Sequence, residues 1–162
     1  MSIETVKAFF KQHGLEDMVM EFDTSSATVE LAAGAVGTIP AKIAKTLSFQ
    51  QKEGGGFLVV TAGDAKIDNV KFKNHFHTKA KMLTPTEVLE LTGHAVGGVC
   101  PFGLDNPVPV YLDISLKRFT TVFPACGSGN SAIALDCETL FKLANGQSWV
   151  DVCKDWDLAL GP

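Results

Sequence analysis

A hairpin pattern at residues 42–63 constrains the fold more than any other feature of the chain. "KIAKTLSFQ" alternates apolar and polar residues, which is the two-residue period of a β-strand. "QKEGGG" follows it, and "FLVVTAG" then gives a second, mostly apolar run. Two strand-like runs joined by a glycine-rich turn predict an antiparallel hairpin. We therefore expect the fold to be built on a β-sheet that contains this hairpin.

Short helices are predicted around this sheet. The clearest lies in "TPTEVLELTG", where Thr84 is the expected N-cap, Pro85 the first helical residue, Glu87 the partner in a capping box and Gly93 the stop. Further helices are predicted over residues 2–13, 27–37, 68–76 and 137–145, with Ser25 or Ser26 capping the second and Asp136 the last; further strands are predicted over 18–22, 106–113, 120–125, 131–136 and 148–152. This order fits neither a Rossmann fold nor a plain βαβ array. It predicts one mixed α/β (α+β) domain, residues 1–162, with a single curved mixed sheet.

Charge and composition limit the classes of function. The formal net charge is −4, which argues against a general nucleic-acid coat protein. The charge is uneven, however: residues 42–81 hold eight lysines and three acidic residues, a local balance of +5 that could form a polyanion site or simply a solvated face. No apolar run approaches the roughly 20 residues of a membrane span, and the N-terminus does not look like a signal peptide. The four cysteines form no CxxC motif, so we expect reduced thiols in a cytoplasmic protein.

The segment "TGHAVGGVCPFG", residues 92–103, is unusually rich in glycine for the middle of an apolar chain. It lacks the strand–GxGxxG–helix context of a dinucleotide site and the GK[ST] ending of a P-loop. Two interpretations stay open. The loop is either a tight turn between core elements, or a loop whose N–H groups face an anion or a reacting carbonyl.

Several single residues also allow two interpretations. Lys45 is flanked by apolar strand residues, so it is either an outward-facing strand lysine or a phosphate-binding charge at a cleft. Cys100 and Cys126 are interpreted as small buried hydrophobes rather than nucleophiles, because no base is evident beside them. His75 and His77 would bind a metal only with a third ligand, and no spacing suggests one, so we expect neither a metal nor a cofactor. Asp113 is expected to order the turn that follows it.

Five segments together resemble a known family. "IAKTLSF", "FLVVTAGDAKID", "LTGHAVGGVCPFG", "PVYLDISL" and "FPACGSGNSAIAL" occur in the order and spacing of the YbaK/EbsC family, over about residues 22–140. This family is related to the editing domain inserted in bacterial prolyl-tRNA synthetases. The resemblance implies a barrel-like mixed sheet and a free-standing deacylase that hydrolyses mischarged aminoacyl-tRNA, typically tRNA(Pro), without a metal. The implied partners are the acceptor 3′ end of that tRNA and prolyl-tRNA synthetase, with no DNA and no membrane.

The resemblance also implies the site residues. The family's signature lysine matches Lys45, and its glycine-containing loop matches Gly97 and Gly98, whose amides would stabilise the oxyanion of the ester. The expected substrate-binding residues are Thr46, Phe22, Phe102, Gly103, Ala125, Gly127 and Ser128. One departure matters: Ala125 and Ala132 stand where members that remove cysteine tend to have Ser and Asp, so deacylation is better supported than cysteine as the amino acid removed. The alternatives are a non-catalytic module that binds an aminoacyl or nucleotide group, and a cysteine hydrolase.

Overall fold

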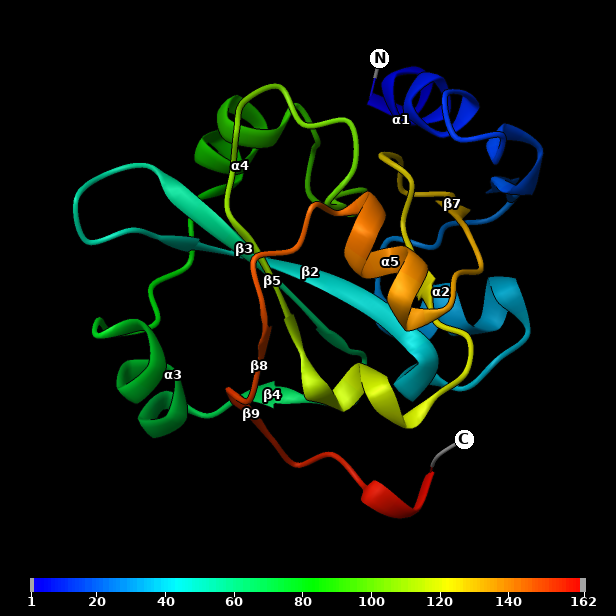
Figure 1. The fold of residues 1–162 in the computed structure, drawn as a ribbon. Coiled ribbons are helices and arrows are strands. Elements are labelled where there is room, and N and C mark those ends of the chain that lie inside the picture. Colours follow the sequence, from blue (N-terminus) through cyan, green and yellow to red (C-terminus); the bar gives the residue numbers. More distant parts are fainter. Residues whose placement is uncertain (1, 161–162) are drawn as a thin grey trace.

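A computed structural model describes residues 2–160 of the chain, and a five-stranded sheet forms its centre (Figure 1). The strand order is β6-β2-β3-β5-β8. The bounds are β2 Ile43–Gln50, β3 Gly56–Ala62, β5 Val110–Asp113, β6 Phe123–Pro124 and β8 Trp149–Val150. β2 and β3 are antiparallel, whereas β6 joins β2, β5 joins β3 and β8 joins β5 in parallel. The mixed α/β class expected from the sequence is therefore confirmed.

The β2–β3 hairpin is the longest pairing in the sheet, and it lies where the sequence predicts it. Its register runs from Ala44 opposite Ala62 to Gln50 opposite Gly56. Every residue of β3 is buried, which is typical of a central strand covered on both faces. Two further two-stranded sheets, which the sequence did not predict as such, lie beside it: β1 (Met20–Glu21) pairs with β7 (Ser131–Ala132), and β4 (Lys66–Ile67) pairs with β9 (Cys153–Lys154).

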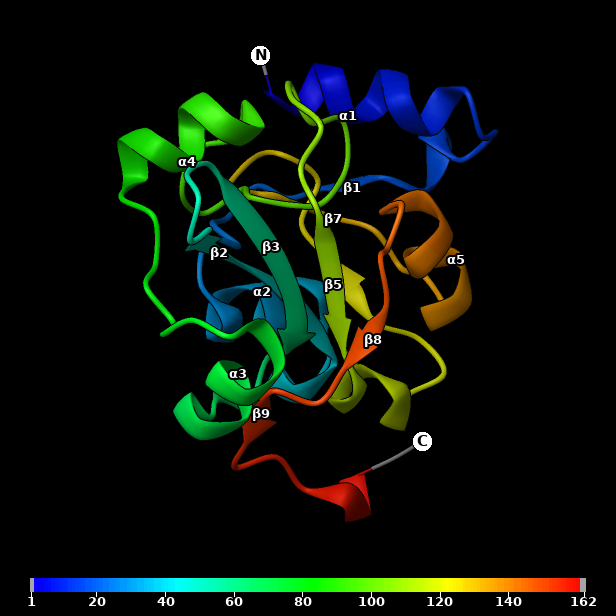
Figure 2. The ribbon, with the colours of Figure 1, turned by 60° about the vertical axis from the view of Figure 1, so that its left-hand side comes forward.

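Five α-helices are packed around the sheet (Figure 2). They are α1 Ser2–Lys11, α2 Val29–Val36, α3 Asn69–Phe76, α4 Pro85–Thr92 and α5 Cys137–Leu143. The capping box of α4 and the cap of α5 by Asp136 are confirmed. The expected cap of α2 is wrong: Thr28, not Ser25 or Ser26, accepts the hydrogen bond from the amide of Leu31. No helix within residues 2–160 is long and apolar enough to cross a membrane.

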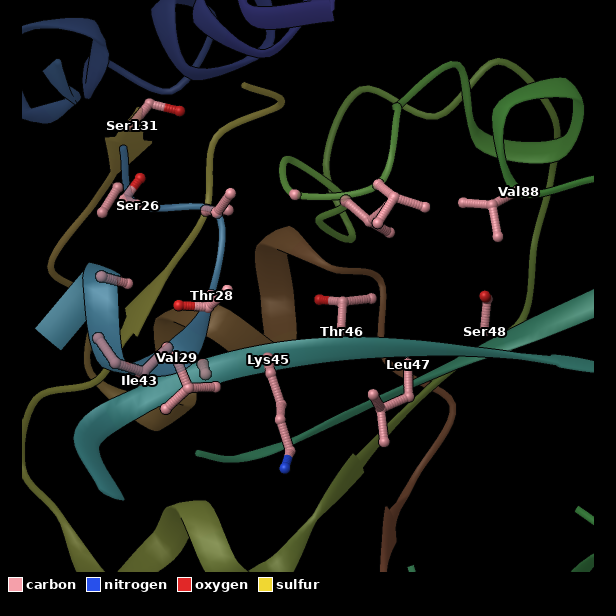
Figure 3. Close-up of a pocket in the computed structure, with 18 of the residues that line it drawn as sticks. Ser26, Thr28, Val29, Ile43, Lys45, Thr46, Leu47, Ser48, Val88 and Ser131 are labelled. Atoms are coloured by element: carbon pink, nitrogen blue, oxygen red, sulfur yellow. The ribbon is translucent and has the colours of Figure 1, made fainter. Parts of the chain in front are cut away.

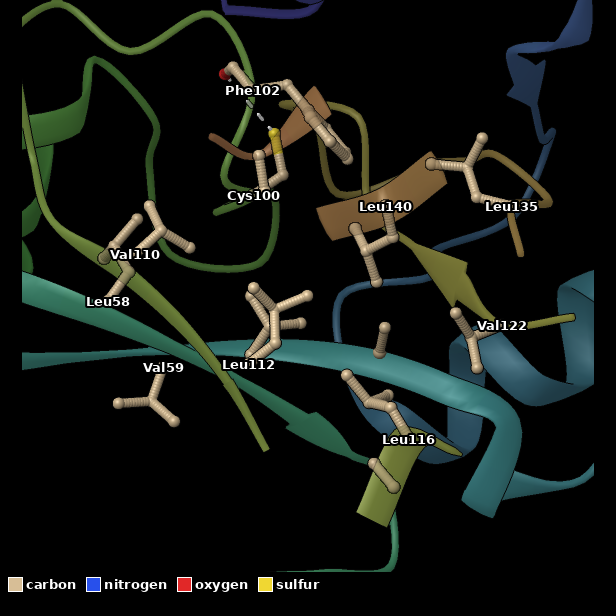
Figure 4. Close-up of a cluster of buried hydrophobic side chains, with 14 of the residues drawn as sticks. Leu58, Val59, Cys100, Phe102, Val110, Leu112, Leu116, Val122, Leu135 and Leu140 are labelled. Atoms are coloured by element: carbon tan, nitrogen blue, oxygen red, sulfur yellow. Dashed lines mark hydrogen bonds between the residues drawn. The ribbon is translucent and has the colours of Figure 1, made fainter. Parts of the chain in front are cut away.

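Apolar side chains fill both faces of the sheet (Figure 4). Val110, Leu112 and Leu140 lie on one side together with Cys100, and Val59 points to the other. Asp113 ends β5 inside this core, where its carboxylate accepts hydrogen bonds from the amides of Ser115 and Val152, both at 2.9 Å. Asp113 thus orders the turn after β5, as expected from the sequence.

His94 fastens the N-terminal helix to the glycine-rich loop. Its ring is 1% exposed. Ser2 Oγ hydrogen-bonds with Nδ1, and Nε2 donates to the carbonyl of Phe102 at 2.7 Å. Burial lowers the pKa of His94, and the bond to Phe102 and the charge of Asp105 oppose that shift only in part. The folded protein therefore holds His94 neutral.

The stability of the protein should fall as the pH drops below the ordinary histidine pKa of 6.5. In that range the unfolded chain takes up a proton at His94 and the folded chain does not, so protons favour unfolding. Replacing His94 with Gln should remove up to about 1.4 kcal/mol per pH unit from the slope of the unfolding free energy between about pH 5 and 7. Denaturant melts across this range measure the slope. The exposed His13→Gln variant is the control, and an equal slope in the wild type and H94Q would contradict the prediction.

Candidate functional site

A cavity of about 270 Å³ opens beside β2 (Figure 3). Strand β2 forms its floor. Its walls come from four other segments: the turn that enters α2, the start of α4 with the residues before it, the glycine-rich loop and the chain around β6 and β7. The lining is mostly apolar, and hydroxyl groups are its main polar side chains, on Ser26, Thr28, Thr46, Ser48 and Ser131.

The floor of the cavity follows from the two-residue period of a strand. Successive side chains of a strand point to opposite faces, so Thr46 and Ser48 share one face and Lys45 takes the other. Figure 3 shows this arrangement, with Thr46 and Ser48 on the cavity side and the Lys45 side chain extending away. Because these floor residues are small, space remains above the strand.

Two hydroxyls in the lining are buried without a hydrogen-bond partner among residues 2–160. They are Ser26 Oγ and Thr46 Oγ1, and Ser26 is 6% exposed. A buried polar atom that stays unsatisfied costs about 1–3 kcal/mol, so such atoms usually have a partner that is absent from the protein itself. Both residues line the same cavity, so its walls hold two polar atoms that have no partner among residues 2–160.

The glycine-rich loop brings a main-chain amide to the cavity. Gly97 lines it with φ of +98°, and within residues 2–160 its N–H has no hydrogen-bond partner. Gly98 does not match the expectation for a second donor, because its N–H donates to the carbonyl of Ala95 at 3.0 Å. A Cβ on Gly98 would lie 2.6 Å from the main chain of Gly127 and Ser128. The glycine at position 98 is thus required for close packing of two loops.

Lys45 contributes to the lining, but its ammonium points away from Gly97. Nζ donates to the carbonyls of Ala65 at 2.6 Å and Gly63 at 3.3 Å, beyond the opposite face of β2. Burial lowers the pKa of Lys45. Within residues 2–160 no carboxylate lies within salt-bridge distance of this amine. Within the described residues, the hydrogen bonds of this half-buried cation therefore go to neutral carbonyl groups.

The other predicted site residues divide into two groups. Ala125 lines the cavity beside Ala132. Phe102 does not, because it is fully buried against the rings of Phe9 and Phe10. Four further predicted residues are likewise absent from the lining: Phe22, Gly103, Gly127 and Ser128. Their contacts lie elsewhere. The amide of Phe22 donates to the carbonyl of Asn130, and the side-chain amide of Asn130 donates to the carbonyl of Phe22. Gly103 and Gly127 lie against α1, and Ser128 hydrogen-bonds with Ser131.

The thiols lie outside the cavity lining. Cys100 is fully buried, and burial raises its pKa to about 12. Cys126 is also buried, and its pKa is raised as well. A thiolate nucleophile needs a lowered pKa and access to substrate, so these two residues act as small core side chains. Among the described lining residues there is no Asp, Glu, His or Cys.

Most lining residues are not among the site residues predicted from the sequence, and Ser48, Ser26 and Val96 show why. Ser48 could have been found, because Thr46 and Ser48 are small polar residues two apart on a predicted strand. Ser26 was interpreted as a helix cap, and its position in the wall depends on a hydrogen bond from its amide to the carbonyl of Gly129. Val96 forms part of the rim and is 66% exposed, which the sequence does not indicate.

The fold and the cavity define a class: a mixed α/β domain with one small, hydroxyl-lined binding site. The model of the aminoacyl-tRNA editing domain matches residues 23–143. The chain therefore belongs to the aminoacyl-tRNA editing domain family, which confirms the resemblance inferred from the sequence.

Individual relatives agree with this family. Uncharacterized protein YwhH of Bacillus subtilis strain 168 is 55% identical over 157 residues, which are 97% of this chain and 100% of that protein. The proline–tRNA ligase of Bacillus licheniformis is 32% identical over 94 residues, 57% of this chain and 16% of the ligase. The crystal structure of a protein proposed as a trans-editing enzyme for prolyl-tRNA synthetase aligns with a TM-score of 0.84 at 31% identity, and the match covers 94% of this chain and 97% of that one.

Close loop packing at Gly98 gives a prediction about stability. Gly98→Ala should destabilise the fold by about 1–3 kcal/mol, because its Cβ would overlap main-chain atoms that cannot move aside. Gly34→Ala is the matched control, since a Cβ there meets nothing within 4 Å inside helix α2 and should stabilise by about 0.5–1 kcal/mol. Urea melts of both variants make the comparison, and an unchanged G98A midpoint would contradict the packing role.

Proposed function

We propose that this chain is a deacylase that acts in trans on mischarged aminoacyl-tRNA and removes a small amino acid, most simply from tRNA(Pro). The observation that carries the proposal is the pair of unpartnered hydroxyls, Ser26 Oγ and Thr46 Oγ1, inside a cavity that also holds the free amide of Gly97. Membership of the editing-domain family supports the reaction class. The substrate and the mechanism are our inference from the site.

The cavity fits the acyl end of such a substrate. At about 30 Å³ per water molecule, 270 Å³ corresponds to roughly nine waters, enough for a small aminoacyl group and part of a ribose. In this pose the hydroxyls of Ser26 and Thr46 accept hydrogen bonds from the α-ammonium. The Gly97 amide then points to the ester carbonyl oxygen.

Hydrolysis in this pose needs little from protein side chains. A water oxygen attacks the carbonyl carbon, negative charge develops on the carbonyl oxygen, and the Gly97 N–H stabilises it by about 3–4 kcal/mol if it acts as an oxyanion-hole donor. The bond between the carbonyl carbon and the ribose oxygen breaks, one proton of the attacking water passes to that oxygen, and the other is lost to solvent as the carboxylate forms. The neighbouring ribose 2′-OH relays the proton, because the described lining offers no carboxylate, imidazole or thiol. The products are the free amino acid and the tRNA.

Lys45 enters the scheme as an anion-binding side chain. In the free protein its ammonium has two carbonyl partners and no carboxylate, so no ion pair must be broken to release it. A phosphate of the terminal nucleotides would compensate its charge better than neutral carbonyls do. We therefore assign Lys45 a substrate-binding role, reached by rotation of its flexible side chain when tRNA binds.

The walls favour small side chains. Ala125 and Ala132 line the cavity where a polar side chain could otherwise read the amino acid. Apolar walls of this kind exclude larger residues sterically but discriminate weakly among smaller ones, by about 1–3 kcal/mol per methylene. Alanine, serine, threonine and cysteine are hence the candidates, and prolyl-tRNA synthetase is a candidate partner.

A panel of tRNA(Pro) charged with Ala, Ser, Thr, Cys or Pro tests the function directly, with release of labelled amino acid as the measurement. We expect turnover of at least one small mischarged residue. Replacing Lys45 with Met, which keeps the apolar stem, should lower kcat/KM roughly ten- to hundredfold, because it removes one charge-assisted hydrogen bond worth about 1.5–3 kcal/mol. The neighbouring exposed Lys66→Met variant should retain activity.

Two results would contradict this scheme. No release from any charged tRNA would favour a non-catalytic binding module of the same fold. Wild-type activity in a well-folded K45M protein would remove Lys45 from substrate binding.

The role of the two hydroxyls is tested with an isosteric pair of substrates. Alanyl-tRNA and lactyl-tRNA differ in having an α-ammonium or an α-hydroxyl group. The wild type should prefer the alanyl ester, and Ser26→Ala with Thr46→Val should reduce that preference about tenfold or more, because each hydrogen bond to a charged group is worth about 1.5–3 kcal/mol.

The double variant should also be at least as stable as the wild type, since it removes unsatisfied buried hydroxyls. Ser131→Ala is the control, because that hydroxyl already has a partner in Ser128. An unchanged preference of the double variant for the alanyl ester would contradict binding of the α-ammonium by the two hydroxyls.

A further inference from the structure

A second hollow lies beside helix α3, outside the cavity described above. Its volume is about 460 Å³, and it lies between α3 and the chain that follows the helix. The lining consists of Asn69, Val70, Lys73, Asn74, Lys79 and Ala80. We refer to these six residues as the α3 hollow.

The charges of the α3 hollow are not neutralised. Lys73 and Lys79 are exposed, and neither forms a salt bridge within residues 2–160. The adjacent Lys71, in contrast, pairs with Asp151 at 3.0 Å and lies outside the lining. The nearest carboxylate in sequence, Asp68, is already engaged with the first amides of α3 as its N-cap. The hollow therefore presents two free ammonium groups to solvent.

Neutral groups complete a lining suited to a sugar–phosphate chain. The side-chain amides of Asn69 and Asn74 have no hydrogen-bond partner among the described residues, so both remain available as donors. Val70 is 70% exposed and offers an apolar surface beside them. Lysine charges and amide donors are typical contacts to nucleic-acid phosphates, and they carry no sequence information.

The α3 hollow and the cavity are lined by residues that are close together in the chain. Ala80 lines the hollow and Met82 lines the cavity, and two residues span at most about 7.6 Å. The segment between them is fixed to the cavity floor: the amide of Gln50 donates to the carbonyl of Lys81 at 2.8 Å, and the amide of Leu83 donates to that of Ser48 at 3.1 Å. The two sites thus keep a constant spacing along one short stretch of chain.

We propose that the α3 hollow binds backbone phosphates of the RNA strand whose 3′ end occupies the cavity. This inference rests on the proposed function and adds to it a second contact surface, distinct from Lys45. Charge complementarity supports it, since a polyanion threading from the cavity past Met82 meets Lys81, Lys79 and Lys73 in succession. Binding there is independent of base sequence and sensitive to salt.

Lys73→Ala with Lys79→Ala tests the proposal on two substrates. On aminoacyl-tRNA the double variant should raise KM about tenfold and leave kcat unchanged. The slope of log affinity against log salt should become shallower by about 2, roughly one unit for each phosphate that no longer meets a lysine. On aminoacyl-adenosine, which is too short to reach the hollow, both constants should equal those of the wild type. The control is Lys11→Ala with Lys142→Ala, which removes the same charge from α1 and α5.

Binding of uncharged tRNA, followed by fluorescence anisotropy, keeps this test separate from the catalytic proposal. One outcome separates the two proposals: the wild type shows no deacylation, and K73A/K79A weakens tRNA binding whereas the control variant does not. In that case the proposed reaction is contradicted and the phosphate-binding role of the α3 hollow is supported. Three results would contradict phosphate binding by the α3 hollow. They are an unchanged tRNA affinity of K73A/K79A, an equal loss of affinity in the control variant, or an equal rise in KM on aminoacyl-adenosine.

Discussion

The alternation of side chains along β2 is the constraint on which the site depends. Seven residue pairs with β3 and two with β6 fix the register of this strand. A slip of one residue would exchange the faces and put Lys45 and Leu47 where Thr46 and Ser48 now form the cavity floor. The small size of these floor residues keeps space above a strand that is otherwise packed on both sides. The same hairpin that forms the centre of the core thus also shapes the cavity.

Elements with local signals could be predicted from the sequence. The hairpin, the capping box at Thr84 and the cap at Asp136 each depend on residues a few positions apart, and each is present in the structure. The short strands β4 and β9 could not be predicted in the same way. They pair residues almost ninety positions apart, and two-residue strands show no periodicity of their own. They form where the C-terminal segment pairs with the chain that follows β3.

The candidate site was also predicted only in part, because some of its residues come together through contacts between distant parts of the chain. Thr46, Gly97 and Ala125 were placed by resemblance and do line the cavity. The direction of one side chain differs from its neighbour: the Lys45 ammonium extends away from the side of β2 that carries Thr46 and Ser48, although both Lys45 and Thr46 line the cavity. Ser26 was missed because only its long-range contact with Gly129 buries it in the wall. The two-residue period of a β-strand predicts that the Lys45 and Thr46 side chains leave β2 on opposite faces.

In the proposed function the cavity and the lysine ammonium groups outside it have different tasks: the cavity binds the ester, and the ammonium groups bind phosphates. Within the described lining the cavity presents hydroxyls and the main-chain amide of Gly97 but no carboxylate, so it suits an uncharged ester carbonyl that gains charge only in the transition state. An ammonium group placed inside would bind phosphate as strongly before the reaction as during it and would raise affinity without raising rate. In the proposed scheme the ammonium groups of Lys45 and of the α3 hollow bind the backbone phosphates that all tRNAs have in common. In this scheme the choice of amino acid depends on the cavity walls, and the affinity for tRNA depends on charges that can change without altering that choice.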